Sequence, residues 1–386
     1  MKTTDTGYLL PNPRIQPLAI HSGEGCYVFD GDGRRYLDFV SGIGVNALGH
    51  NHPRIVAAIA EQARLCVHIS NLYSHPYQAR VARELCRMAG MDRALFTNSG
   101  TEATEAALKL ARCYGIPRKK TRFVALCGSF HGRTRGALGL AGQPSLRDPF
   151  GPYATEVTFV APNDRDGIQA AVDERTAAVI LEPVLGEGGV CPLSAEFLKA
   201  ARGATQARDA LLIADECQSG LGRTGAHFAF QWSGIEPDIV TVAKPLAAGI
   251  PLGAVLFTEA VNRSIPPGTH ATTFGGGPLA CRAAVEFLAM LDELLPHVRA
   301  MGDRLRAGLD AMRSRRSVIC EVRGRGLMIG IELNRPAHEF VQDALDRGLL
   351  INCTQENVIR LLPPYILTCE QADEGLEILD EVLAAA

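Results

Sequence analysis

The stretch DALLIADECQSG, residues 209–220, decides the fold class, because it holds an apolar strand that ends in a carboxylate. The strand spans Leu211–Ala214, and Asp215 follows it directly. Further along the chain a second apolar run, Ile239–Val242, leads through an alanine to Lys244. Short, continuous apolar runs of this kind are typical of strands that helices cover on both faces.

Five further apolar runs lie around these two strands and alternate with segments of helical period; they span residues 94–97, 123–126, 157–160, 178–181 and 254–257. This alternation predicts an α/β fold with a mainly parallel, seven-stranded sheet. Before the sheet, Pro53 begins a helix with an apolar face, which we predict from Ile55, Ile59, Ala63 and Cys66. After the sheet, we predict a helix over residues 279–295.

Both chain ends have a different pattern. The first fifty residues hold short strands around the turn at 30–33, which is typical of a small sheet. The last hundred residues mix strands, at 327–333 and 349–352, with an amphipathic end at 371–383. We therefore predict a small α+β domain built from both chain ends. The expected segments are 1–52 for its N-terminal part, 53–284 for a large domain and 285–386 for its C-terminal part.

Composition excludes several classes of protein. At about 150 residues per domain, 386 residues predict two or three domains. The 39 basic and 42 acidic side chains give a net charge of −3 without a block of one sign, so we expect no nucleic-acid partner. The eleven cysteines show no metal-binding spacing and predict free thiols in a reducing cytosol. No apolar run reaches the ~18 residues that span a bilayer, and no signal peptide is recognisable, so we expect a cytoplasmic protein without a membrane partner.

Polar residues that follow the strands are candidates for a site, because ligands of open α/β sheets bind beyond the carboxyl ends of the strands. In FTNSGTEA, residues 96–103, Ser99 and Glu102 fit a capping box. Gly100 and Thr101 offer backbone N–H groups and a hydroxyl at a helix N-terminus, which is how proteins hold a phosphate. The cluster alone favours the cap and the phosphate site equally.

Two charged residues follow apolar strands. Asp215 is a helix cap, a metal ligand or the partner of a cofactor's ring nitrogen, and the metal is the weakest option because no histidine lies at ligand spacing. Lys244 enters a loop of Gly and Ala, where a desolvated amine can form a Schiff base. The loop GTHATTFGGG, residues 268–277, is either a turn or a phosphate contact. Together these features predict a pyridoxal 5′-phosphate site and no metal site.

The sequence resembles the class III pyridoxal-phosphate-dependent aminotransferases over nearly its whole length, and most closely the acetylornithine aminotransferases. The matching strings are YLDFVSGIGVNALGHNHP, FTNSGTEATEAALKLAR, SFHGRT, LEPVLGEGGV, IADECQSGLGRTG, DIVTVAKPLAAGIPLGA, HATTFGGGPLAC and VIRLLPP. The resemblance implies a fold-type I transferase. It also implies transfer of the ω-amino group of N-acetylornithine to 2-oxoglutarate, giving N-acetylglutamate semialdehyde and glutamate in arginine biosynthesis.

The resemblance also implies roles for single residues. Lys244 and Asp215 are expected to be catalytic, as the lysine that carries the cofactor and the acid at its ring nitrogen. Gln218 is expected to bind the ring's 3-oxygen, and Phe130 to stack on the ring. The phosphate is expected to bind Gly100 and Thr101 of one subunit and Thr273 of the other, which implies a homodimer with a shared active site.

The substrate-binding residues implied are Arg133 for the α-carboxylate, Thr272 beside the substrate, and Glu187 with Arg360 as a movable ion pair. His131 is expected to help place Phe130 and Arg133 or to make a local hydrogen bond in its loop, and not to act in catalysis. The chain departs from the commonest family pattern at Leu185, Thr104, Gly277 and residues 247–249, none of which removes an assigned chemical group.

Other functions stay open. Related enzymes act on ornithine, succinylornithine, 4-aminobutyrate or carrier-bound lysine, and ornithine-specific members often have a tyrosine where this chain has Ile43. An aminomutase or decarboxylase with the same fold is a second option. A catalytically dead scaffold is the least favoured, because Lys244, Asp215 and Arg133 are all present.

Overall fold

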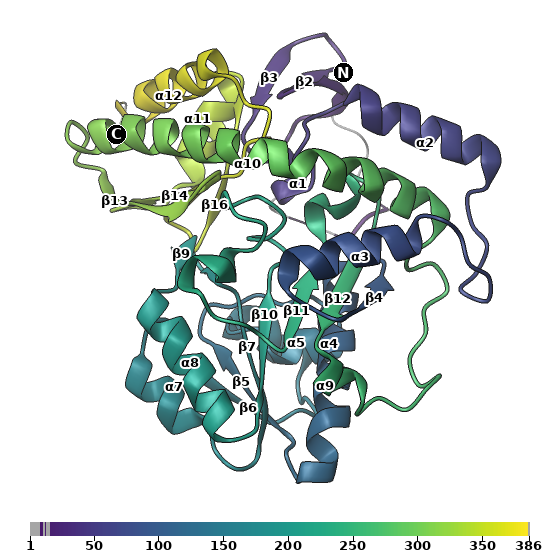
Figure 1. The fold of residues 1–386 in the computed structure, drawn as a ribbon. Coiled ribbons are helices and arrows are strands. Elements are labelled where there is room, and N and C mark those ends of the chain that lie inside the picture. Colours follow the sequence, from purple (N-terminus) through teal and green to yellow (C-terminus); the bar gives the residue numbers. More distant parts are fainter. Residues whose placement is uncertain (1–7, 11, 13–15, 385–386) are drawn as a thin grey trace.

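A seven-stranded sheet forms the centre of the molecule (Figure 1). The structure is a computed structural model that describes residues 8–10, 12 and 16–384. The strand order is β4-β12-β11-β10-β7-β5-β6. The strands are β4 (Arg93–Thr97), β5 (Arg122–Leu126), β6 (Val157–Val160), β7 (Thr176–Leu181), β10 (Leu211–Asp215), β11 (Ile239–Val242) and β12 (Gly253–Phe257). Within this sheet β12 pairs antiparallel with both β4 and β11, and the other pairings are parallel. The predicted seven strands and the mainly parallel α/β fold are therefore confirmed.

Helices cover the sheet, so that the residues of β7, β10, β11 and β12 are buried throughout. These helices are α3 (Gln78–Ala89), α4 (Gly100–Gly115), α5 (Arg135–Gly139), α6 (Pro144–Arg147), α7 (Arg165–Ala171), α8 (Ala195–Ala207) and α9 (Glu259–Asn262). Burial on both faces explains why the strands are continuous apolar runs in the sequence.

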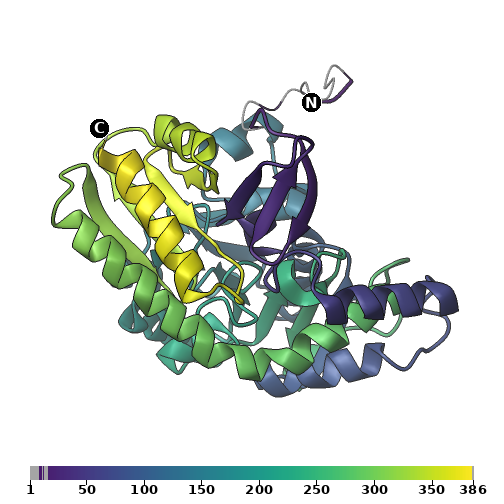
Figure 2. The same cartoon turned by 90° about the horizontal axis from the view of Figure 1, so that it is seen from above.

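The longest helix, α10 (Pro278–Arg313), joins the sheet to the C-terminal part of the chain. Figure 1 shows α10 crossing the whole molecule, and Figure 2 shows that it curves. The predicted end at residue 295 is wrong, because the helix continues through Pro296. Proline removes one intrahelical hydrogen bond, but Leu291, Val298 and Leu305 are fully buried on either side of it. Packing of this apolar face outweighs the local disruption.

The two chain ends build two smaller sheets. One has the order β1-β2-β3-β15, in which β15 (Leu349–Leu350) pairs parallel with β3. The other has the order β13-β14-β17-β16. The remaining bounds are β1 (Ile20–Glu24), β2 (Tyr27–Asp30), β3 (Arg35–Asp38), β13 (Ile319–Arg325), β14 (Met328–Leu333), β16 (Asn352–Thr354), β17 (Val358–Leu361), α11 (His338–Asp346) and α12 (Cys369–Ala384). Figure 2 shows the N-terminal strands beside the C-terminal elements. The bounds of the three predicted segments stay a prediction.

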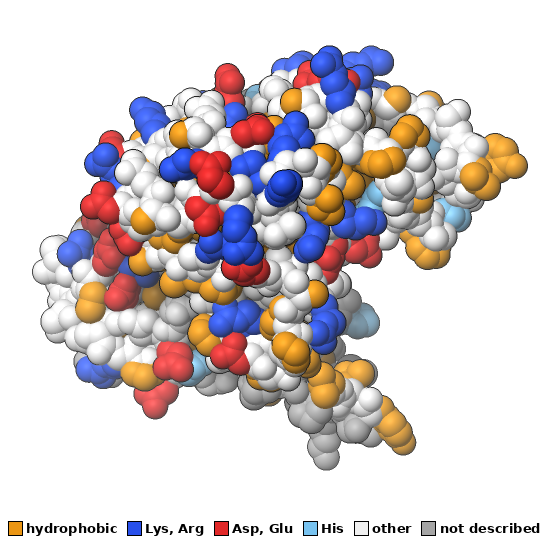
Figure 3. Space-filling view, turned by 90° about the horizontal axis from the view of Figure 1, so that it is seen from below, with side chains coloured by type: hydrophobic (Ala, Val, Ile, Leu, Met, Phe, Trp, Pro, Cys, Tyr) orange, Lys and Arg blue, Asp and Glu red, His pale blue; other side chains and the backbone are white. Residues whose placement is uncertain are grey.

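Two helical segments and one hairpin remain to be named, besides short 3-10 helices. They are the turn α1 (Ser41–Gly44), the helix α2 (Pro53–Leu65) and the hairpin of β8 (Val184–Leu185) and β9 (Cys191–Pro192). The predicted face of α2 is wrong at Ala63, which is exposed, whereas Ala58 and Gln62 are buried. No helix in the described part of the chain is long and apolar enough to cross a membrane. Figure 3 shows acidic and basic side chains interspersed over one face of the molecule.

Candidate active site

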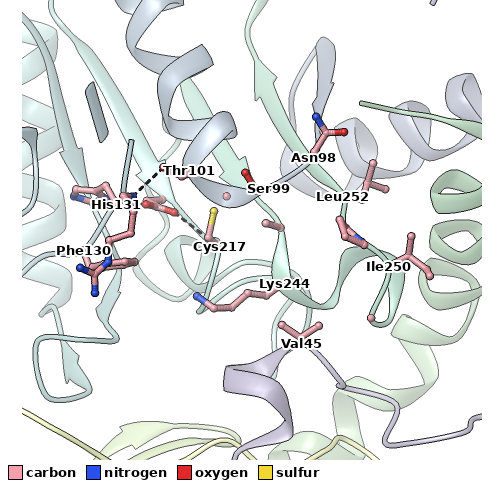
Figure 4. A pocket seen from close by; sticks show the side chains of 17 residues that line it. Val45, Asn98, Ser99, Thr101, Phe130, His131, Cys217, Lys244, Ile250 and Leu252 are labelled. Carbon is pink, nitrogen blue, oxygen red and sulfur yellow. Dashed lines mark hydrogen bonds and ion pairs between the residues drawn. The ribbon is translucent and has the colours of Figure 1, made fainter. Parts of the chain in front are cut away.

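A cavity of about 450 Å³ opens at the carboxyl ends of the parallel strands (Figure 4). It is lined by loops that follow β4, β5, β10 and β11, and the lining includes Ser99, Gly100, Thr101, Phe130, His131, Arg133, Asp215, Cys217 and Lys244. Volumes of about 300–1,000 Å³ are usual for small-molecule sites. The sheet thus brings together the predicted lysine, the predicted carboxylate, the helix N-terminus and the SFHGRT loop.

Lys244 begins the short 3-10 helix η4 (Lys244–Ala247), one residue after the end of β11. Its φ of 27° lies in the left-handed region, which costs a non-glycine residue about 1–3 kcal/mol. Figure 4 shows that its side chain extends into the cavity below Cys217. The fold therefore holds this amine in the cavity at the expense of local strain, as is common for functional residues.

Asp215 ends β10 and is bound by three donors. His131 Nδ1 lies 2.7 Å from Oδ2, while Thr241 Oγ1 and Cys217 N donate to Oδ1 at 2.9 and 3.1 Å. Burial raises the pKa of Asp215, but the hydrogen bond and charge of His131 and the Cys217 N–H lower it below its usual value. Asp215 is therefore a stable buried anion.

His131 corrects an expectation from the sequence. Its bond is not local to the loop, because the ring is fully buried and pairs with Asp215 on another strand. Burial lowers the pKa of His131, but the hydrogen bond and charge of Asp215, with the charge of Glu182, raise it above its usual value overall. Its Nε2 has no hydrogen-bond partner among the described residues. The sequence did not show this pairing, because it depends on how the β5 loop folds over β10.

Glu182 is a buried residue that the sequence analysis missed. Its Oε1 accepts from Phe130 N at 2.9 Å, and its Oε2 accepts from Gly186 N at 3.0 Å. Burial and the charge of Asp215 raise the pKa of Glu182 to about 7, although His131 and the two N–H groups oppose the shift. Glu182 directly follows β7, so inspection of every strand end would have found it.

The N-terminus of α4 shows the helix cap predicted from the FTNSGTEA cluster, and the phosphate site stays a prediction. Ser99 Oγ accepts from Glu102 N at 3.3 Å and caps the helix, but Glu102 Oε2 accepts from Asn98 N at 2.7 Å and not from Ser99 N. The expected capping box is thus correct in one of its two bonds. The N–H groups of Gly100 and Thr101 have no intrahelical acceptor and line the cavity. A Cβ at Gly100 would lie 3.0 Å from Cys217 Sγ, so a side chain there would narrow the cavity.

Glu187 and Arg360 form the predicted ion pair, which does not line the cavity. Arg360 Nη1 lies 2.5 Å from Glu187 Oε1 and donates to Gln218 Oε1 at 3.1 Å. The Arg360 side chain is 1% exposed and that of Glu187 is 21% exposed. Gln218 therefore contacts Arg360 in this structure, and its expected contact with a cofactor stays a prediction.

Thr272 and Thr273 lie on a loop outside the cavity lining. Thr272 Oγ1 accepts from Gly275 N at 3.2 Å and from Asn98 Nδ2 at 3.5 Å, which fastens the loop near β4. Thr273 is exposed. Thr273 therefore lies on the surface of the chain. A surface position is what the prediction that Thr273 binds the phosphate of a second subunit requires.

The donor set fits pyridoxal 5′-phosphate. The cavity offers an amine at Lys244, a buried anion at Asp215, free N–H groups at a helix N-terminus and an aromatic ring at Phe130. These are the groups that bind an aldehyde, a pyridinium, a phosphate and a ring face, respectively. Without a side chain at position 100, the helix N-terminus stays open to an anion.

Comparison with known proteins gives the class. The class III aminotransferase family profile matches residues 11–383, and the chain belongs to this family. It is therefore a pyridoxal-phosphate-dependent aminotransferase of fold-type I.

Particular relatives are similar over nearly their whole length. The chain is 46% identical to acetylornithine aminotransferase 1 of Bordetella bronchiseptica, with 94% of each chain covered. Among solved structures, N-acetylornithine aminotransferase from Stenotrophomonas maltophilia is 33% identical with a TM-score of 0.85, and 98% of each chain is covered. The ornithine aminotransferase of Toxoplasma gondii ME49 is 31% identical with a TM-score of 0.94, covering 98% of this chain and 93% of that chain.

Proposed function

We propose that the enzyme moves the ω-amino group of N-acetylornithine to 2-oxoglutarate, as a step of arginine biosynthesis in the cytoplasm. The observation that carries this proposal is a pair of arginines in different states. Arg133 lines the cavity and is exposed, whereas Arg360 is buried and paired with Glu187. A site of this kind suits a donor with one carboxylate and an acceptor with two. The named relatives that act on acetylornithine support the choice of donor.

Lys244 and Asp215 are proposed as the catalytic residues. Bound pyridoxal phosphate supplies an electron sink for the reaction. Lys244 Nζ holds the cofactor covalently, and as a free amine it accepts and returns a proton at the reacting carbon. Asp215 keeps a negative charge next to the ring nitrogen, because His131, Thr241 and Cys217 hold its carboxylate ionised and in place.

Four further residues are proposed to bind the cofactor. Gly100 and Thr101 offer the phosphate the N–H groups of the first turn of α4. Phe130 lines the same cavity as Lys244, to its left in Figure 4, and offers a ring face. Gln218 binds the 3-oxygen with its amide, although its Oε1 now accepts from Arg360.

Arg133 and the Glu187–Arg360 pair are proposed to select substrates, with Thr272 beside them. Arg133 binds the carboxylate far from the reacting carbon in both substrates. When the donor is bound, Glu187 neutralises Arg360. When 2-oxoglutarate is bound, Arg360 turns from Glu187 to the carboxylate beside the keto carbon, because a guanidinium binds carboxylates in bidentate geometry.

We also propose a homodimer with a shared active site. Large apolar side chains are exposed at the end of α2, on the segment after it and on the loop of Thr273; they are Leu65, Leu72, Tyr73 and Phe274, between 65% and 86% exposed. Exposed apolar patches of this kind mark interaction surfaces. A second copy that covers them places its Thr273 at the phosphate of this chain.

A panel of donors, each with 2-oxoglutarate as acceptor, tests the proposal. The panel holds N-acetylornithine, ornithine, succinylornithine, 4-aminobutyrate and lysine. We expect kcat/KM to be highest for N-acetylornithine. A higher value for any other donor contradicts the proposed substrate and leaves the class of enzyme intact.

Free ornithine is the second candidate, because an ornithine aminotransferase is among the structures with the highest TM-score. Ile43 argues against it. This residue is 40% exposed and lies where ornithine-specific members often have a tyrosine. The aliphatic side chain of Ile43 cannot hydrogen-bond the free α-amino group of ornithine, so it does not favour ornithine as the substrate.

A further inference from the structure

The loop that carries Arg133 is fastened to one face of α4 by successive hydrogen bonds. Thr101 Oγ1 accepts from Arg133 N at 3.0 Å and from Thr134 N at 3.2 Å. One turn further along α4, Glu105 Oε1 accepts from Gly136 N at 2.8 Å and from Ala137 N at 3.2 Å. Thr101 and Glu105 lie on the same face, since they are four residues apart.

Two glycines allow the loop to approach α4 this closely. A Cβ at Gly132 would lie 2.1 Å from Thr101 Oγ1, and a Cβ at Gly136 would lie 2.2 Å from Glu105 Oε2. Each glycine thus faces one of the two acceptors. Arg133 lies between the two contacts, so its backbone position is set by both of them.

The carboxylate of Glu105 does not line the cavity. Its hydrogen bonds go to the N–H groups of Gly136 and Ala137 in the first turn of α5. A five-residue helix such as α5 has little stability of its own. The position of α5, and of Arg133 before it, therefore depends on Glu105 as the acceptor for the first N–H groups of the helix.

We propose that Glu105 is a positioning residue that sets where Arg133 binds the substrate's carboxylate. The inference rests on the proposed function only in the role of Arg133. Glu105 acts through the backbone of residues 133–137, and Thr101 holds the other end of the same segment. Glu105 thereby links substrate binding to the helix that is proposed to hold the cofactor's phosphate.

The test compares two donors that differ only in the carboxylate. N-acetylornithine has it, and N-acetylputrescine is the same molecule without it. In Glu105→Ala we expect kcat/KM for N-acetylornithine to fall by about tenfold to a hundredfold, because small misplacement of a binding group has effects of this size. The value for N-acetylputrescine should change less than about threefold, since Arg133 has nothing to bind in that donor.

Two further variants separate position from charge. Gly136→Ala keeps the carboxylate but displaces it from the two N–H groups, so it should lower the ratio of the two kcat/KM values as Glu105→Ala does. Glu105→Gln keeps an oxygen acceptor and should retain most of the ratio. The control is Glu84→Ala, which removes a helix carboxylate whose partner, Arg87, lies on the same helix. It should leave the ratio unchanged.

A second readout needs no cofactor. In the apoprotein we expect amide hydrogen exchange of residues 133–137 to be faster in Glu105→Ala than in the wild type, while exchange in β10 stays the same. Unchanged exchange over 133–137 overturns the inference. Equal losses of kcat/KM for both donors also overturn it, because they indicate a general structural defect.

Arg133→Ala separates this inference from the proposed function. If Arg133→Ala lowers the ratio and Glu105→Ala does not, the positioning role of Glu105 is wrong and the role of Arg133 stands. If Arg133→Ala leaves the ratio unchanged, Arg133 is not the carboxylate ligand. The proposed role of Arg133 and the proposed role of Glu105 then both fail.

Discussion

Two buried ionisable side chains, Asp215 and His131, line the cavity, and a third, Glu182, lies behind them. Asp215 contacts His131 directly, and Glu182 adds a second negative charge nearby. Burial raises the pKa of Glu182, whereas the pKa of Asp215 is lowered in spite of its burial, because His131 is hydrogen-bonded to it. At the scale of single residues, Asp215 therefore has a lowered pKa beside two groups, His131 and Glu182, whose pKa values are raised.

Asp215→Asn should retain some cofactor and lose most transamination. The amide keeps the shape of the side chain but removes the charge that favours a protonated ring nitrogen. We expect turnover to fall by about 100-fold or more, as for other groups that stabilise charge in a transition state. Steady-state rates with saturating cofactor measure this. Near-normal turnover, or activity that depends on an added divalent metal, contradicts the assignment.

His131→Asn should reduce stability in a pH-dependent way. The pKa of His131 is raised in the fold, so its contribution to stability is complete below its ordinary pKa and is lost as the pH rises through the folded value. The difference in Tm between wild-type and variant apoprotein should be larger at about pH 6 than at about pH 9. Asparagine retains a donor for Asp215 without a charge. A difference that does not vary with pH shows that the histidine is neutral.

Lys244 should carry the cofactor. Reduction of the holoenzyme with borohydride, followed by peptide mapping, should place a phosphopyridoxyl group on Lys244. The same treatment of Lys244→Arg should give no modified peptide. Modification of another lysine in the wild type disproves the assignment.

Sequence reasoning reached the residues of this site to different degrees. Asp215 and Lys244 were predictable because each follows an apolar strand, and that position alone puts a side chain at the sheet's ligand-binding edge. His131 was not, because its partner lies on a different strand and its burial depends on the loop around it. Only the structure shows that Asp215 is buried and that its hydrogen bond to His131 keeps it ionised.

At the scale of elements, the turn between β8 and β9 and the strand β17 act together. The backbone carbonyl of Glu187 accepts from Thr354 Oγ1 at 2.5 Å and from Gln355 Nε2 at 2.8 Å. Both donors belong to the segment that leads into β17, the strand of Arg360. These hydrogen bonds hold the backbone of Glu187 next to the segment that leads to Arg360. Only the two side chains therefore need to move for the ion pair to open.

Removal of either partner should bias the two half-reactions in opposite directions. Breaking a buried, hydrogen-bonded charge pair costs about 2–5 kcal/mol. In Glu187→Ala, Arg360 should stay available to carboxylates, which favours glutamate and 2-oxoglutarate over N-acetylornithine. In Arg360→Ala, the 2-oxoglutarate half-reaction should suffer most. Single-turnover measurements of each half-reaction decide; equal slowing of both halves in both variants shows that the pair is only structural.

Element boundaries were predictable where one periodic pattern decides them. The seven strands were, since each is an apolar run between polar segments. The end of α10 was not, because Pro296 suggests a local stop and only tertiary packing of the residues beyond it keeps the helix going. The face of α2 was wrong at Ala63 because alanine fits a buried and an exposed position equally well.

At the scale of the whole molecule, the exposed apolar side chains at and after the end of α2 are the surface of the proposed dimer. Leu72→Asp combined with Phe274→Asp should give a monomer in analytical ultracentrifugation, because each large apolar side chain contributes about 1.5–3 kcal/mol when buried. Cofactor affinity should fall with it, since Thr273 of a second copy is lost. The control, Ile116→Asp, changes an exposed apolar side chain at the end of α4 and should stay dimeric. A double variant that remains dimeric disproves this surface as the interface.

The pairing of β15 with β3 also orders events during synthesis on the ribosome. Leu37 pairs with Leu349, so the edge of the first sheet to emerge has no partner until nearly the whole chain has been translated. At on the order of 10 residues per second, the nascent strand β3 waits roughly half a minute. An unpaired strand edge is prone to associate with other chains. Binding by chaperones during this interval is expected to concentrate on the N-terminal strands, and truncation before residue 349 should leave the released fragment prone to aggregate.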